Sequence, residues 1–373
     1  MRILGIETSC DETAVAVVED GVHVKSNMIS SSRATFEKLA GVIPEQAARM
    51  QIECMLPVLT QALKDAGVTM ERIDAIALTK GPGLLGSLLV GGVTGRMLAS
   101  IHKKPLIGVH HTLGHLSSTW LEGGMIIANS NKPINQSTNP RPDQAGKDPH
   151  FPLLTLSASG GHTDLWLRES HTRGRILGGT RDDAAGEAFD KGASMLGLPY
   201  PGGPSIEKAA KGGKVDAYEF PRPLHNDESL DFSCSGLKTS LKYLLRDLYG
   251  RHTVTPLPPD ETHLADLAAS YQHAICRHLT DRLGKAIHQF PEIKEIHIVG
   301  GVSANGHLRS LVADLAATSG KGITVRVPQS LSFCTDNGAM IAAAGFFLHE
   351  ELGEKAYETF STEASLPLQM VMH

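Results

Sequence analysis

The sequence predicts an α/β protein of two similar lobes that face each other across a cleft. Its 373 residues exceed what one domain of ordinary size needs. Two patterns, each present once in either half of the chain, indicate that the lobes share one plan. The first is a β-hairpin with a small polar tip, and the second is a strand that runs through a glycine turn into a helix.

The two hairpins are the clearest part of this repeat. Residues 2–18 (RILGIETSCDETAVAVV) are two β-forming runs around a polar tip at 9–13, and residues 153–167 (LLTLSASGGHTDLWL) have their tip at 159–162. Tips of this kind present backbone N–H groups to an anion such as phosphate. Each half therefore holds a candidate phosphate-binding loop.

The strand–glycine–helix units follow each hairpin, at residues 74–92 and 295–312. A glycine turn that opens a helix places the helix N-terminus beside a bound anion. Together the patterns indicate the actin, Hsp70 and sugar-kinase (ASKHA) superfold, with duplicated RNase H-like lobes and an interlobe cleft. The alternative is two unrelated α/β domains with ordinary tight turns.

We expect an N-terminal lobe of residues 1–110 plus about 345–373, and a C-terminal lobe of residues 111–344. A polar, Pro- and Asn-rich stretch at 129–150 predicts a surface loop within the second lobe. The longest apolar stretch, 84–101, contains Arg96 and several glycines, so we interpret it as a buried helix and not as a membrane span.

Composition and charge favour an ordinary cytoplasmic protein. Hydrophobic residues make up 41% of the chain, and the net charge is −5 without a basic tail. If RNA is a substrate, a local patch or a partner protein must supply phosphate contacts. The five cysteines form no CxxC pair, which predicts reduced thiols, and we expect no targeting segment at the N-terminus.

His111 and His115 are a candidate pair of metal ligands. Their i,i+4 spacing puts both imidazoles on one face of a helix, about one turn apart. A histidine pair without a metal is an equally good interpretation of the spacing alone. Zinc proteases of the HExxH type need a glutamate directly after the first histidine, where this chain has Thr112. A metalloprotease would therefore lack its general base.

Asp336 is the candidate third ligand. It lies just before an apolar run with helical spacing, so it could instead be the N-cap of that helix. Combined with the histidines, it gives a set of two imidazoles and one carboxylate with open coordination positions. Such a set suits one divalent metal, Fe²⁺ first and Zn²⁺ second, and leaves room for substrate.

At this point the residues resemble the bacterial TsaD family, the tRNA N6-adenosine threonylcarbamoyltransferases, once called glycoprotein endopeptidases. The similarity extends over nearly the whole chain, with the motifs in family order. The matching segments are 5–17, 41–49, 81–91, 110–115, 159–163, 182–204, 231–239, 300–309 and 334–342.

The resemblance implies an acyltransferase that moves a threonylcarbamoyl group from threonylcarbamoyl-AMP to N6 of adenosine 37, in tRNAs that read ANN codons, which forms t6A. It implies His111, His115 and Asp336 as metal ligands. It also implies a nucleotide and substrate site lined by Ser157, Ala158, Ser159, Gly160, Gly161, Asp190, Gly203, Glu207 and Asn305. The partners implied are tRNA, the inactive paralogue TsaB and the ATPase TsaE, without a membrane.

The chain departs from the family pattern near its first helix. Many members have His-x-x-Tyr-Gly-Gly where this sequence has residues 36–41, and a histidine where it has Gln51. These departures put partner or RNA contacts of that segment in doubt. Cys234 also replaces a phenylalanine of the family motif.

The reaction needs a group that removes a proton from the exocyclic amine, which is a poor nucleophile. Asp11 and Glu12 at the first hairpin tip are our candidates for this general base, and a turn-capping role is the alternative. Three other functions remain open at this stage. They are an ATP-dependent small-molecule kinase of the same superfold, a metalloprotease, and a scaffold without catalysis.

Overall fold

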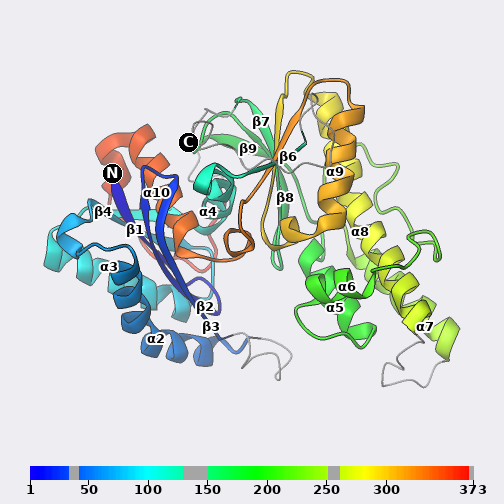
Figure 1. Ribbon diagram of the computed structural model, residues 1–373, viewed down its shortest axis with the longest axis horizontal. Helices are drawn as coiled ribbons and strands as arrows, with labels where there is room; N and C mark the ends of the chain where they lie inside the picture. The colour runs from blue at the N-terminus through cyan, green and yellow to red at the C-terminus, as the bar shows by residue number, and fades with distance from the viewer. Residues whose placement is uncertain (33–41, 129–149, 251–260, 369–373) are drawn as a thin grey trace.

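The computed structural model describes residues 1–32, 42–128, 150–250 and 261–368. Two mixed sheets, each with its own helices, form two lobes, and the short helix α4 (His111–Ser117) lies between them (Figure 1). The predicted loop at 129–150 and the departures at 36–41 fall almost entirely outside the described residues.

The first sheet has the strand order β3-β2-β1-β4-β5. Its first three strands are antiparallel, and β4 and β5 run parallel to β1. The strands are β1 (Arg2–Glu7), β2 (Glu12–Glu19), β3 (His23–Ser31), β4 (Ala75–Gly81) and β5 (Leu106–His110).

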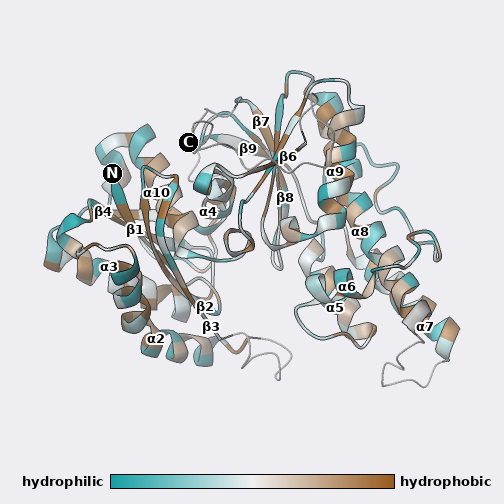
Figure 2. Ribbon diagram, viewed as in Figure 1, coloured by the Kyte–Doolittle hydropathy of each residue, from teal (hydrophilic) through white to brown (hydrophobic). Residues whose placement is uncertain are grey.

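Alternating side chains of these strands pack against helices on the two faces of the sheet. Leu4, Ile6 and the other side chains on the same face of the sheet pack with α2 (Pro44–Asp65), and α3 (Leu85–His102) lies beside β4. Side chains on the opposite face pack with α10 (Gly338–Leu352). The apolar colour of the strands in both lobes reflects this two-sided burial (Figure 2).

The second sheet has the order β6-β11-β10-β7-β8-β9. Its strands are β6 (Met125–Ala128), β7 (Leu153–Ala158), β8 (Thr163–Arg168), β9 (Gly174–Gly179), β10 (Glu295–Val299) and β11 (Thr324–Val327). Its helices are α5 (Ala185–Met195), α6 (Gly202–Ala209), α7 (Ser235–Tyr249), α8 (Glu261–Gln289) and α9 (Gly306–Thr318).

The two lobes repeat one plan, as the sequence predicts. The β7–β8 hairpin corresponds to the β1–β2 hairpin, and in each sheet a third strand, β3 or β9, extends the hairpin in antiparallel order. A later strand, β4 or β10, then joins the first strand of the hairpin in parallel and leads into a helix, α3 or α9. The prediction of a duplicated two-lobed α/β fold is confirmed.

Helix α10 places the C-terminal part of the chain on the first sheet. It packs so tightly that a Cβ on Gly5 would lie 2.1 Å from the carbonyl oxygen of Gly338. The boundary that we expected near residue 345 falls inside this helix. We propose instead that the chain returns to the first lobe before Gly338, because α10 packs on β1 from its first residue.

The prediction of a buried helix at 84–101 is wrong in one respect. The helix exists as α3, but its buried positions include the small residues Ser87, Gly91 and Gly95, which let it approach the sheet closely. A Cβ on Gly95 would lie 2.3 Å from Leu78. Leu88 is buried, but five other large apolar side chains face outward and form the α3 stripe, with exposures of Leu85 51%, Leu89 45%, Val93 53%, Met97 58% and Ile101 67%.

On the neighbouring helix α2, Ile52 and Leu56 add two exposed apolar side chains to the five of the α3 stripe. Nevertheless, none of the helices in the described ranges combines the length and the apolar character that crossing a bilayer requires.

Candidate metal and nucleotide site

Helix α4 carries the two candidate histidine ligands. His110, the last residue of β5, caps this helix by accepting a hydrogen bond from the backbone N–H of Thr112 at 3.1 Å. The rings of His111 and His115 lie one turn apart with centroids at 4.7 Å, and both side chains are buried. The predicted i,i+4 geometry is therefore present.

Asp336 approaches both imidazoles from the loop before α10. Its Oδ1 lies 3.1 Å from Nε2 of His115 and 3.6 Å from Nε2 of His111. The alternative role as a helix cap belongs to its neighbour, because Asn337 accepts from the backbone N–H of Met340. One ligand atom from each of the three residues lies within 4.8 Å of the others, a spacing that fits a single ion.

The charges at this group favour a cation. Burial lowers the pKa of His111, but the carboxylates of Asp336 and Glu7 outweigh burial and raise it to about 9. Burial raises the pKa of Asp336, and the imidazoles of His111 and His115 outweigh it, so that this pKa lies below its usual range. The group thus stabilises positive charge at its centre, as a cation site requires.

Glu7 contacts this group, and the sequence analysis did not select it. Its Oε2 lies 3.2 Å from Nδ1 of His111, and the hydroxyl of Ser9 lies 3.1 Å from the same nitrogen. Glu7 is fully buried at the end of β1. A carboxylate at the end of the apolar run 3–6 is a visible signal, but its partner is 104 residues away in the chain.

The first hairpin tip lies close to the candidate metal-binding group, which is His111, His115 and Asp336. Glu12, the first residue of β2, is mostly buried, and Ser31 donates to its Oε1 at 3.4 Å. Asp11 is more exposed. The buried Gln51 of α2 donates from Nε2 to the carbonyl oxygens of Cys10 at 3.1 Å and Glu12 at 2.8 Å. Gln51, which stands where many family members have a histidine, therefore holds the tip in place.

The second hairpin tip follows Ser157 and Ala158 of β7. Within it, Ser159 donates its backbone N–H to the carbonyl of His162 at 2.8 Å. Burial lowers the pKa of His162 to about 4, and the nearby His111 and His115 add to this effect. The second tip thus lies within electrostatic reach of the metal-binding group, so both lobes contribute to one region.

A pocket of about 270 Å³ adjoins this region, and Thr335 next to Asp336 forms part of its wall. All the residues that line it come from the second lobe. They include the predicted Gly160, Asp190, Gly203, Glu207 and Asn305, together with Tyr200, Pro201, Val302 and Leu331.

Three glycines, two at the second hairpin tip and one at the start of α6, have no close neighbour among the described residues that would require glycine. Gly160, Gly161 and Gly203 all have ordinary φ angles, and a Cβ added at any of them would meet no atom within 4 Å. Elsewhere in this fold glycines mark close packing, as at Gly5. Here the absent side chains leave backbone N–H groups open to a ligand.

The polar residues of the pocket also hold its walls. Asp190 accepts from the backbone N–H of Gly202 at 2.7 Å, and Glu207 accepts from that of Gly306 at 2.8 Å. Asn305 caps α9 by accepting from the backbone N–H of Leu308 at 2.9 Å, and it also donates to Gln272 at 2.8 Å. These contacts fix the starts of α6 and α9 around the pocket.

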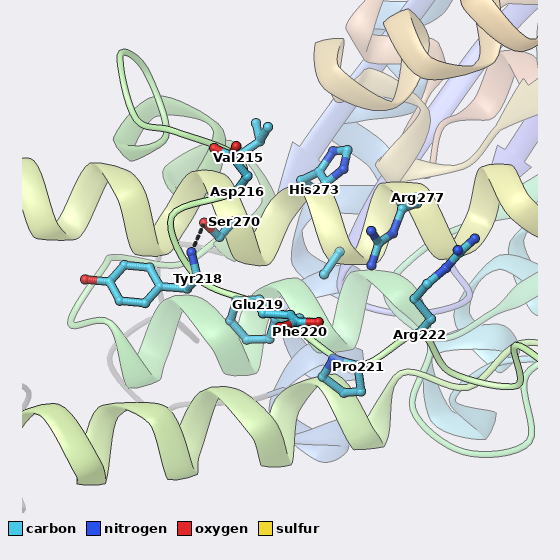
Figure 3. Close-up of a pocket in the computed structure, with 11 residues that line it drawn as sticks. Val215, Asp216, Tyr218, Glu219, Phe220, Pro221, Arg222, Ser270, His273 and Arg277 are labelled. Atoms are coloured by element: carbon cyan, nitrogen blue, oxygen red, sulfur yellow. Dashed lines mark hydrogen bonds between the residues drawn. The ribbon is translucent and has the colours of Figure 1, made fainter.

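A larger hollow of about 420 Å³ lies along α8, opposite the segment 215–222 (Figure 3). Its wall mixes acids such as Asp216 and Glu219 with Arg222 and Arg277, and none of the predicted site residues lines it. Because the smaller pocket adjoins the histidine–aspartate group, we place the candidate site there.

Comparison with known proteins identifies relatives over almost the full length of the chain. The family described as TsaD, tRNA N6-adenosine threonylcarbamoyltransferase, matches residues 23–130 and 138–343. A protein of that name from Symbiobacterium thermophilum is 45% identical over 93% of this chain and 91% of its own length. Another from Thermomicrobium roseum is 42% identical over 99% of this chain and 97% of its own length.

A solved structure shares the fold at low sequence identity. T. kodakarensis HypF aligns with a TM-score of 0.57 and 13% identity, over 95% of this chain and 49% of that protein. This likeness supports the two-lobed superfold and says nothing about the reaction.

Proposed function

Because this chain belongs to the TsaD family, it is a tRNA N6-adenosine threonylcarbamoyltransferase, and we propose how its residues perform that transfer. The product is t6A. The donor we propose is threonylcarbamoyl-AMP, and the acceptor is N6 of adenosine 37 in tRNAs that read ANN codons. The kinase, protease and scaffold alternatives no longer apply to a chain with these relatives.

We propose that His111, His115 and Asp336 bind one divalent metal, Fe²⁺ first and Zn²⁺ second. The observation that supports this is the convergence of three ligand atoms within 4.8 Å, from a helix of one segment and a loop 221 residues further on. Such a metal, when bound, supplies Lewis-acid polarisation of a donor oxygen. Three protein ligands leave positions for that oxygen.

The nucleotide of the donor is proposed to lie in the 270 Å³ pocket, with its phosphate at the second hairpin tip. Ser157 through Gly161 end a strand and turn beside that pocket, and the two glycines expose backbone N–H groups. Negative charge develops on the AMP leaving group as the carbamoyl bond breaks. Fixed N–H donors stabilise that charge without reorganising.

One of Asp11 and Glu12 is proposed to accept the proton that the amine loses. Glu12 lies close enough to His111 for its charge to raise the pKa of that imidazole. Burial raises the pKa of the Cys10 thiol, and the charges of Asp11, Asp336 and Glu12 raise it further. A carboxylate held near the metal-binding group can take a proton from an amine that attacks a donor bound there.

The partners proposed are tRNA, the inactive paralogue TsaB and the ATPase TsaE, in the cytoplasm. The α3 stripe supports a protein partner, because an apolar surface of this length on a globular protein marks an interaction site. A paralogue with the plan of the first lobe would present an equivalent helix face. The five free cysteines agree with a reducing compartment.

The direct test is mass analysis of nucleosides from unmodified tRNA that has been incubated with this protein, its partners, threonine, bicarbonate and ATP. The proposal predicts t6A only in reactions that contain this chain. A control with preformed threonylcarbamoyl-AMP removes the need for the enzyme that makes the donor. Absence of t6A in that control, with folded protein, would contradict the proposal.

A further inference from the structure

Glu7 receives more hydrogen bonds than its place in a strand explains. Its Oε1 accepts from the backbone N–H of Ser9, and its Oε2 accepts from Thr79 Oγ1 at 2.5 Å. The same Oε2 lies 3.2 Å from Nδ1 of His111. The side chain is fully buried. Three neighbours thus direct donors at one buried carboxylate.

The contact with Glu7 determines which nitrogen of His111 keeps its proton when the imidazole is neutral, which is the form that binds a metal. A carboxylate only accepts hydrogen bonds, so Nδ1 must donate to Glu7. The lone pair of the neutral ring then lies on Nε2, the nitrogen that faces Asp336 at 3.6 Å. A neutral imidazole binds a metal through this lone pair.

The two histidines differ in this respect. Nδ1 of His115 is buried without a hydrogen-bond partner in the described part of the chain, whereas Nδ1 of His111 has Glu7 and Ser9 beside it. Glu7 itself is held by the sheet, because it ends β1 and its donor Thr79 lies on the neighbouring parallel strand β4. The anchor for His111 is therefore part of the rigid sheet.

We propose that Glu7 is a positioning residue, which fixes the tautomer and the orientation of His111 for metal binding. This inference rests on the metal site proposed above. Carboxylates that hold metal-binding histidines in this way typically contribute about 10–100-fold to metal affinity. Glu7 touches neither the donor nor the acceptor in this account, and acts only through His111.

The test is titration of the metal-free protein with Co²⁺, followed by its visible absorption. Glu7→Gln keeps the shape of the side chain but replaces one acceptor oxygen with an NH₂ group, which donates hydrogen bonds and cannot accept them. We expect Co²⁺ affinity to fall by about 10–100-fold. Thr79→Val, which removes only one donor to Glu7, should weaken binding in the same direction by about tenfold or less.

Glu295→Gln is the matched control, because Glu295 is also a buried carboxylate bonded to an imidazole, with His297 Nε2 at 2.8 Å, in the other lobe. It should lower stability and leave Co²⁺ affinity unchanged. Equal affinity in wild type, Glu7→Gln and Thr79→Val would overturn the role of Glu7 alone. A wild-type protein that binds no Co²⁺ would overturn the metal site itself, and this inference with it.

Discussion

At the scale of single residues, the two acids of the first hairpin tip differ in their surroundings. Glu12 is mostly buried and lies within reach of the metal-binding group, whereas Asp11 is more accessible to a substrate. A carboxylate that faces a bound phosphate is unfavourable unless a cation or a proton transfer compensates its charge. This cost favours a chemical role for one of the two over simple turn capping.

Asp11→Asn and Glu12→Gln test that role separately. For the residue that acts as the base, transfer from preformed threonylcarbamoyl-AMP should fall by about 10²–10⁴-fold, while metal and nucleotide still bind. Single-turnover rates, measured with metal content on the same preparations, check this. Near-normal rates in both variants would assign the proton to water or to the leaving phosphate.

The open glycines of the second tip lead to another prediction. Gly161→Val should weaken AMP binding and leave the fold intact, because the new side chain meets no protein atom near its Cβ but blocks the exposed N–H groups. Calorimetry with AMP and thermal unfolding measure the two effects. Gly236→Ala, at a glycine equally open but outside the pocket, is the control. Unchanged AMP affinity in Gly161→Val would count against a phosphate at this tip.

The sequence indicated the candidate ligands but not the residues that orient a ligand or the first hairpin tip. His111 and His115 are visible through their helical spacing, and Asp336 through its place before a helix. Glu7 and Gln51 act on residues distant in the chain, through contacts that exist only once the sheet and α2 have packed. Residue types and local spacing cannot report such contacts.

At the scale of elements, hairpins and strand–glycine–helix units were predictable because their signals are local. The orientation of α3 was not predictable, because an apolar helix has the same sequence pattern whether it packs in a core or against a partner. Only the packing shows that its glycines face the sheet and its large side chains face outward. The same limit explains why the boundary near 345 fell within α10.

The α3 stripe predicts how the protein associates. Val93→Asp, in the middle of the stripe, should abolish complex formation with the paralogue, because it buries a charge in an apolar interface. Analytical ultracentrifugation of mixed proteins measures this. Leu248→Asp, at an exposed apolar position of α7, should leave the complex intact. If both variants lose association equally, or if neither loses it, the interface lies elsewhere.

At the scale of the whole molecule, the candidate metal site lies between the lobes. Its three residues lie on α4 and just before α10, and both helices belong to one apolar core that includes Trp166 and Val299 of the second sheet. Closure or opening of the lobes would therefore act on the site directly. The duplication, visible in the sequence, explains why two loops converge there.

Buried histidines make the stability of this molecule dependent on pH. Burial lowers the pKa of His278 and His297 to about 4 and that of His171 to about 3. In the unfolded chain the pKa of each of these imidazoles is about 6.5. Between these values the unfolded state binds more protons, so the free energy of unfolding falls with falling pH, by up to about 1.4 kcal/mol per pH unit for each histidine.

Thermal unfolding of the metal-free protein between pH 7 and pH 4 checks this prediction. The midpoint should decrease steadily below about pH 6.5, where the unfolded imidazoles begin to protonate. A midpoint that stays constant down to pH 4 would mean that these histidines are not held neutral by the fold.

The central claim is that one metal, bound by His111, His115 and Asp336, is required for transfer to tRNA. The most direct measurement is metal content together with t6A yield in the His111→Ala, His115→Ala double variant, each compared with wild type. Both should fall to background while circular dichroism shows the native fold. Full metal occupancy, or wild-type t6A yield without metal, would contradict the account.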